Sequence, residues 1–143
     1  MLFQAQEGAD SKADIKLWVL AAGTNDVERK RAFRQRDRDA YRVLVQSCLR
    51  IAPESRVLAC DISYRTDRTK EIVDQCNDLQ KGLVDEINLQ LGEEKVIWVE
   101  SRHHLRKELL DDHVHLNEEG YREWDALLWP LCQAVLEDTL AMR

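Results

Sequence analysis

The chain has 143 residues, enough for one domain with a core of its own. Its 34% charged and 44% hydrophobic residues are ordinary for a globular protein, and its net charge of −6 argues against nucleic acid or an anionic membrane as a partner. No apolar run approaches the roughly 20 residues that span a bilayer. Residues 1–14 contain acids and no long apolar stretch, so no signal peptide is visible, which favours a cytoplasmic protein.

Three short apolar runs predict β-strands. Each is rich in Val, Ile, Leu or Trp and nearly uninterrupted, as strands buried on both faces are. They are residues 15–20, 56–62 and 95–100.

Three stretches with apolar residues at steps of three and four predict helices. Their apolar faces are Tyr41, Leu44, Val45, Cys48 and Leu49, then Ile72, Cys76, Leu79, Leu83 and Ile87, then Tyr121, Trp124, Leu128, Leu131 and Val135. Pro53 should close the first helix and Gly92 the second, and Asn117 is a natural N-cap for the third. Pro130 should kink or interrupt the third helix because proline cannot donate the backbone hydrogen bond.

The alternation of strands and helices predicts an α/β domain. We expect three parallel strands, in the order of the chain, with right-handed crossovers and helices on both faces. Ligands of open parallel sheets bind beyond the carboxyl ends of the strands. The turn at residues 23–26 and the loop at residues 101–115 should therefore meet at one rim of the sheet.

His115 is the best candidate for a general base. Asp112 precedes it by three residues, close enough for the carboxylate to accept a hydrogen bond from the imidazole and fix its tautomer. The alternative is a histidine that only helps to begin the helix after Asn117.

Asn25 is the candidate oxyanion donor, at the end of the first predicted strand. Gly23 permits the turn that would present the amide side chain, and Asp26 should shape that turn by a local hydrogen bond. The alternative is an ordinary turn, since Gly, Asn and Asp are common turn residues.

Other residue clusters offer weaker alternatives. The four histidines, with Asp111 and Asp112 among them, suggest zinc, although their spacing is not that of a regular ligand set; they are His103, His104, His113 and His115. Residues 28–42 are dense in arginine but interleaved with acids, which favours a solvated helix start over a phosphate-binding patch. The cysteines form no Cys-x-x-Cys pair and are expected to be buried free thiols; they are Cys48, Cys60, Cys76 and Cys132.

Gly23-Thr24-Asn25-Asp26, read with Asp112-His113-Val114-His115-Leu116-Asn117, resembles the last two signature blocks of the SGNH (GDSL-type) ester hydrolases. The resemblance runs from about residue 15 to the last helix and implies a three-layer α/β/α, flavodoxin-like fold. It further implies cleavage of acyl esters of lipids or sugars through a Ser-His-Asp arrangement, with no metal or other cofactor. The implied catalytic residues are His115 and Asp112, with Asn25 and Gly23 in the oxyanion hole.

The nucleophile of that family has no counterpart in the sequence. No strand leads into Gly-Asp-Ser, and the closest echo, Asp10-Ser11, has no strand before it. The remaining serines lie within a helix or flank strands without a glycine-rich turn; they are Ser47, Ser55, Ser63 and Ser101. Cys60 lies late in a strand and is expected to be part of the core.

The expectation is therefore an N-terminally truncated, single partial SGNH domain over residues 1–143, in which residues 1–14 are the remnant of a helix or a linker. The strand at residues 15–20 would then be an open edge, with Trp18 and Val19 bordering uncovered surface, and the chain should self-associate through it. The alternative function is a non-catalytic remnant that binds an acyl or sugar ligand, or a partner chain, at the same rim.

Overall fold

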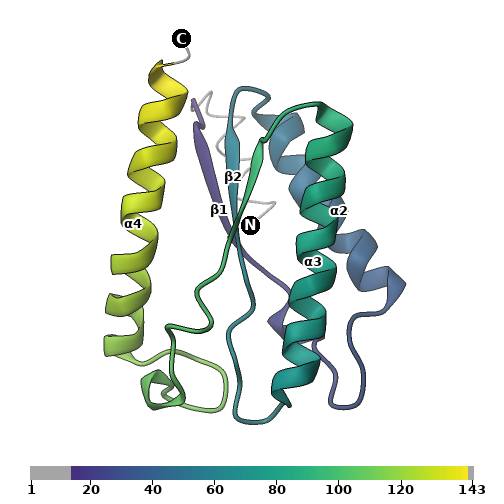
Figure 1. The fold of residues 1–143 in the computed structure, drawn as a ribbon, viewed down its shortest axis with the longest axis vertical. Coiled ribbons are helices and arrows are strands. Elements are labelled where there is room, and N and C mark those ends of the chain that lie inside the picture. Colours follow the sequence, from purple (N-terminus) through teal and green to yellow (C-terminus); the bar gives the residue numbers. More distant parts are fainter. Residues whose placement is uncertain (1–13, 142–143) are drawn as a thin grey trace.

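The computed structural model describes residues 14–141 as a three-layer α/β/α arrangement, with a sheet between helices (Figure 1). The sheet of the described residues has three parallel strands in the order β1 (Leu17–Ala21), β2 (Arg56–Cys60) and β3 (Val96–Val99). β1 and β2 pair in a register that places Val19 beside Leu58, and β2 and β3 in one that places Leu58 beside Ile97. The predicted fold class, strand positions and strand order are confirmed. Residues 1–13, predicted as a remnant helix or linker, lie outside the described residues.

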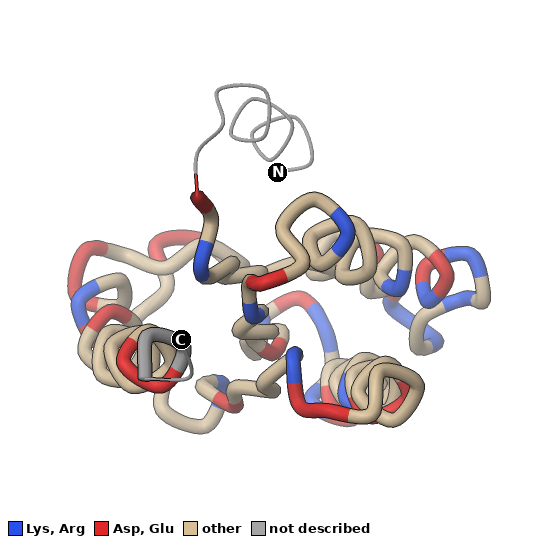
Figure 2. Tube along the Cα trace, turned by 90° about the horizontal axis from the view of Figure 1, so that it is seen from above, with Lys and Arg blue, Asp and Glu red and all other residues tan. Residues whose placement is uncertain are grey.

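Two helices cover one face of the sheet and one covers the other (Figures 1 and 2). α2 (Gln35–Ile51) and α3 (Lys70–Leu91) pack their apolar sides on the face that carries Trp18, Leu20 and Val57. α4 (Glu118–Ala141) packs on the opposite face, which carries Leu58 and Val99. Because successive strand residues point to opposite faces, β2 is buried on both sides, as its uninterrupted apolar sequence predicts.

The predicted helix ends at Gly92 and Asn117 are confirmed. Gly92 closes α3 in a left-handed conformation, with φ of 73°. Asn117 lies directly before α4, and its side-chain oxygen accepts a hydrogen bond from the backbone N–H of Gly120 at 2.8 Å. The bond satisfies one of the free donors at the start of a helix that follows the candidate base directly.

α4 differs from its prediction in two ways. The helix continues through Pro130 without an interruption. The side that packs on the sheet contains the buried Leu128 and Val135 and the partly buried Trp124 and Cys132. Tyr121 and Leu131, which the sequence places on the same apolar face, are exposed. The helix has more apolar residues than one face can bury, so the placement of the helix on the sheet decides which of them are covered.

Two buried polar side chains of α3 hold the ends of β1 and β2. Asn77 bonds both the N–H and the C=O of Ile62, at 2.7 and 2.9 Å, and Gln80 donates to the carbonyl oxygen of Ala22 at 2.9 Å. The backbone just past each strand would otherwise lack partners in a buried place. Both strand ends are thus fixed where the candidate site begins.

Within the described residues, no helix is both long enough and apolar enough to span a bilayer. The arginine-rich segment pairs with acids: Arg34 lies 2.8 Å from Glu28, and Arg42 pairs with Glu86 of α3. This is the solvated helix start that the sequence favours.

Candidate functional site

The loop before α4 brings Asp112 and His115 together. Oδ2 of Asp112 lies 2.8 Å from Nδ1 of His115, and Oδ1 accepts hydrogen bonds from the backbone N–H groups of Val114 and His115, at 2.8 and 2.7 Å. One carboxylate therefore folds the loop and orients the imidazole. With Nδ1 engaged, Nε2 is the nitrogen left for a reacting group.

These hydrogen bonds also fix the charge of Asp112. The N–H groups of His115 and Val114, with the His115 imidazole, hold the pKa of Asp112 well below its ordinary value. The carboxylate is therefore ionised throughout the neutral range, which suits a group that stabilises a protonated imidazole.

The loop at residues 110–116, which we call the His115 loop, is anchored at both of its ends. Leu110 and Leu116 form an antiparallel bridge, and the N–H of Asp111 donates to the carbonyl of His115 at 2.7 Å. The loop is also tied to the segment after β2, where the N–H of Thr66 donates to the carbonyl of His113 at 3.1 Å. The imidazole therefore rests on a loop that is held from two directions.

The turn after β1 takes the shape that its glycine predicts. Gly23 has φ of 110°, and a Cβ there would lie 2.5 Å from the side-chain nitrogen of Gln80, so a larger residue would both strain the backbone and clash. The next three residues form a short 3-10 turn, Thr24–Asp26. Asp26 was expected to shape the turn by a local hydrogen bond. Among the described residues, the bond that it makes within the turn is from its backbone N–H to the carbonyl oxygen of Gly23, and its carboxylate takes no part in that bond.

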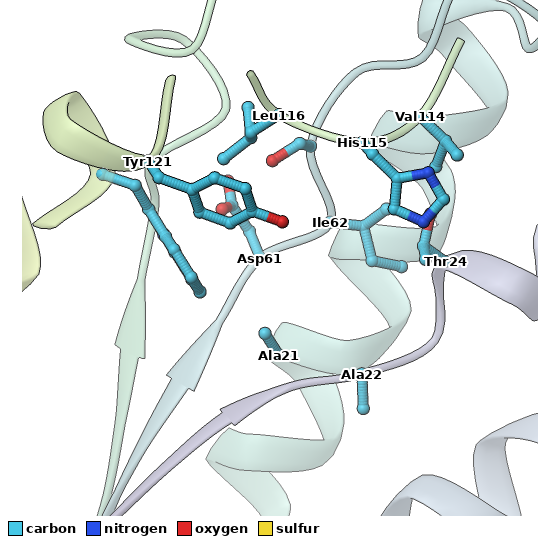
Figure 3. Close-up of a pocket in the computed structure, with 11 residues that line it drawn as sticks. Ala21, Ala22, Thr24, Asp61, Ile62, Val114, His115, Leu116 and Tyr121 are labelled. Atoms are coloured by element: carbon cyan, nitrogen blue, oxygen red, sulfur yellow. The ribbon is translucent and has the colours of Figure 1, made fainter. Parts of the chain in front are cut away.

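A cavity of about 210 Å³ lies between the two motifs (Figure 3). His115 and Thr24 line it from its two loops, and Figure 3 shows the imidazole beside Thr24 and Ile62 at one end, with Tyr121 at the other. Asn25 is exposed on the rim next to Thr24 but does not line the cavity, and Gly23 lines a smaller one beside α2. We call this cavity the His115 pocket; its lining residues are Ala21, Ala22, Thr24, Asp61, Ile62, Ser63, Val114, His115, Leu116, Tyr121 and Trp124.

A buried ion pair supports the floor of the His115 pocket. Asp61 follows β2 directly and accepts hydrogen bonds from the backbone N–H and hydroxyl of Ser101, and from the backbone and guanidinium of Arg102. Arg102 also reaches Asp74 of α3 at 3.1 Å. No local motif predicts this network, because its bonded partners lie 28 to 41 residues apart in the chain. An acid directly after a buried strand is the one signal visible in the sequence.

Cys48, Cys60 and Cys76 are buried as expected, whereas Cys132 is only partly buried. Burial raises the pKa of the Cys60 thiol to about 12, so this cysteine is unsuited to be a nucleophile. The four cysteines are free thiols. Ser63 lines the His115 pocket, but it follows Ile62 without the glycine-rich turn of a nucleophile. Ser11 lies outside the described residues.

The histidine cluster does not assemble into a ligand set. Within residues 14–141, no three His, Cys, Asp or Glu side chains are arranged to hold a metal ion. His113 instead lies 3.8 Å from Asp67, and His103 packs edge-on against Tyr64.

Comparison with known proteins places this fold. A family model described as the GDSL-like Lipase/Acylhydrolase family matches residues 2–123. No curated protein matches the chain. Among solved structures, a carbohydrate esterase family 3 protein from Talaromyces cellulolyticus has a similar fold, with 22% identity and a TM-score of 0.68. A serine-to-alanine mutant of an acetyl esterase with an acetate ion is also similar, with 21% identity and a TM-score of 0.74.

Each of these two alignments covers 94% of this chain and 64% of the other. A family 3 carbohydrate esterase of Clostridium thermocellum is similar over 95% of this chain and 68% of its own, with 17% identity and a TM-score of 0.62. At such identities the likeness shows the fold. The chain spans about two thirds of the length of these structures.

Proposed function

Because the chain belongs to the GDSL-like lipase/acylhydrolase family, we propose that it supplies the base and an oxyanion donor of a serine ester-hydrolase site. The observation that carries the proposal is the hydrogen-bonded pair of Asp112 and His115, with the imidazole lining a cavity at the carboxyl end of the sheet. The substrate class we propose is a small acyl ester of a sugar or lipid. The two similar structures described as esterases, and a cavity of about 210 Å³, support a short acyl group.

In the proposed mechanism, Nε2 of His115 takes the proton of a serine hydroxyl as the oxygen attacks the ester carbonyl. The same nitrogen then returns the proton to the leaving alcohol, and water repeats the cycle to release the acid. Asp112 stays ionised and stabilises the imidazolium that forms between these transfers. These steps require no metal or cofactor.

The proposed oxyanion donor is the side-chain amide of Asn25, in the turn that Gly23 permits. Its support is its position: Thr24, the preceding residue, lines the His115 pocket. The turn is also anchored, because Arg65 donates to the carbonyl oxygen of Thr24 at 2.8 Å. A donor held before the charge develops is worth more than one that must reorganise.

The proposal assigns the nucleophile to no residue of these 143, because no Gly-Asp-Ser occurs in the sequence. Fluorophosphonate labelling of the 143-residue chain tests this directly. We expect no labelled serine in a folded sample, and a labelled serine would show that this part of the proposal is wrong.

The role of His115 is tested in a form of the protein that also carries a serine nucleophile. His115→Ala should lower kcat/KM for short acyl esters by about 10²–10⁴-fold, the usual effect of losing a general base. His104→Ala is the matched control, since His104 is exposed and its backbone N–H, which the substitution keeps, donates to the carbonyl oxygen of Ser101. Unchanged turnover in His115→Ala would remove this residue from the mechanism.

A second candidate is a non-catalytic protein that binds an acyl or sugar ligand in the His115 pocket. The absence of Gly-Asp-Ser favours it. This function would be supported over hydrolysis if the chain bound acetate or an acylated sugar saturably, took up no fluorophosphonate label and did not turn over esters.

A further inference from the structure

A second cavity, of about 460 Å³, is lined mainly by cations at the carboxyl end of the sheet. We call it the basic cavity; its basic lining residues are Arg65, Arg68, Lys70, Arg102, Arg106 and Lys107. Glu108 is the acid among its lining residues. In a chain with a net charge of −6, this concave site has the opposite sign and should attract anions.

Not all of this positive charge is neutralised within the protein. Four of the cations are paired with four carboxylates, those of Asp61, Asp67, Asp74 and Glu100. Among the described residues, Arg106 and Lys107 have no carboxylate within ion-pair distance, and both are exposed. The basic cavity therefore has two cations available to a ligand, beside four that are held in place.

The aromatic ring of Tyr64 forms part of the wall. Its hydroxyl donates to Asp74 at 2.6 Å, and its ring packs edge-on against His103 with 5.7 Å between centroids. Lys70 and Arg102 lie 5.5 and 5.9 Å from the ring centroid. A fixed ring next to cations suits a ligand that has an apolar or sugar-ring surface as well as a negative group.

The basic cavity and the His115 pocket are linked by hydrogen bonds between their lining residues. Ser63 lines one and Tyr64 the other. Asp61 of the His115 pocket bonds Arg102 of the basic cavity, and Thr24 is bonded by Arg65. Both cavities therefore border the segment that follows β2.

We propose that the basic cavity binds an oxyanion, a carboxylate or phosphate group carried by the alcohol part of the ester substrate. The identity of this ligand as the ester substrate rests on the proposed function, whereas the anion site itself does not. Arginine and lysine would hold the oxyanion by charge-assisted hydrogen bonds, with Tyr64 against the adjoining ring. The protein would then select acidic acylated sugars or phosphorylated alcohols over neutral ones.

The test is a titration of the 143-residue chain at low ionic strength with three probes: glucuronate, inorganic phosphate and glucose. The heat of binding, measured by calorimetry, or the amide chemical shifts, measured by NMR, should show saturable binding of an anion and no binding of glucose. The relative affinities of glucuronate and phosphate show which oxyanion the site prefers. Added salt should weaken the binding by screening.

Two double variants locate the site. Arg106→Gln with Lys107→Gln should weaken anion binding about tenfold, because two charge-assisted contacts are lost. Arg29→Gln with Lys30→Gln is the matched control, because it removes the same charge from an exposed Arg-Lys pair outside the basic cavity. The affinity of this control for the anion should stay within about twofold of that of the unaltered chain.

Absence of saturable anion binding, or equal weakening in both double variants, would overturn the proposal. Because the titration requires no turnover, these outcomes are separate from those for hydrolysis. His115→Ala should bind the anion like the unaltered chain even where it abolishes ester cleavage.

Discussion

At the scale of residues, Asp112 selects the tautomer of His115. The carboxylate accepts from Nδ1, so a neutral imidazole has its proton on Nδ1 and an unprotonated Nε2, on a ring that lines the pocket. This is the state that a general base requires.

The tautomer can be measured without any substrate. In long-range ¹H–¹⁵N spectra, neutral His115 should have its proton on Nδ1, and Asp112→Asn should shift the population toward Nε2–H. An unchanged tautomer in Asp112→Asn would mean that the carboxylate does not orient the ring. His104 in the same spectra serves as an exposed reference.

Asp67 links acid stability to the segment that supports both cavities. A hydrogen bond from Arg65, together with the charges of Arg65 and Arg68, lowers its pKa from the ordinary 3.8 to about 2. Because the folded-state pKa is the lower one, the stabilisation is complete above the unfolded value and is lost as the pH falls toward 2.

We therefore expect Asp67→Asn to lower the free energy of unfolding by a constant amount from neutral pH down to about pH 5. The difference between the variant and the unaltered chain should shrink between pH 3.8 and about 2. Urea unfolding across this range is the measurement. A difference that persists at pH 2 would show that Asp67 acts through geometry rather than charge.

At the scale of elements, the start of α4 and the His115 loop touch at Gly120. A Cβ there would lie 2.7 Å from the carbonyl oxygen of Leu109 and 3.0 Å from the Leu116 side chain. The close approach holds the loop against the helix, so glycine is required here for space.

Gly120→Ala should destabilise the protein by about 1–3 kcal/mol, because overpacking outweighs the gain in helix propensity. Gly82→Ala is the matched control, since Gly82 lies within α3 and a Cβ there meets nothing within 4 Å. The control should be stabilising by up to about 1 kcal/mol. Thermal melts compare the two, and a Gly120→Ala variant as stable as the control would show that the loop can move away.

At the scale of the whole molecule, β1 pairs with β2 on one side and with no other strand of the described residues. Val19 is 39% exposed, whereas Trp18 is buried and donates to the hydroxyl of Ser55 at 2.9 Å. The expected uncovered surface therefore includes Val19 but not Trp18. Open strand edges with apolar neighbours recruit partners.

We expect the chain to form a dimer or soluble oligomer through β1 at low micromolar concentration, and Val19→Lys to shift it toward the monomer. A specific contact buries about 800 Å² per partner, so such an interface would need surface next to β1 as well as the strand itself. Val43→Lys is the control, since Val43 is 54% exposed on α2. Sedimentation decides: a monomer that melts cooperatively before and after Val19→Lys would contradict the prediction.

The sequence by itself determined the features that depend on residues close together in the chain. Apolar runs predicted the three strands, and periodic faces predicted the helices with their ends at Gly92 and Asn117. The pair Asp112 and His115 was equally visible, because three residues separate a carboxylate from the imidazole that it binds. The parallel order followed from the alternation of strands and helices, which needs no more than local patterns and chain connectivity.

Tertiary structure decided what depends on residues far apart. Asn77 and Gln80 were not visible as supports of the strand ends, because their partners are backbone groups 15 and 58 residues away. The side of α4 that is buried depended on how the helix lies on the sheet. The basic cavity likewise collects arginines and lysines from the segment after β2, the start of α3 and the segment after β3, and only packing shows which charges are neutralised. Local periodicity fixes which element forms, but the partner of a buried polar or charged group is set by the fold as a whole.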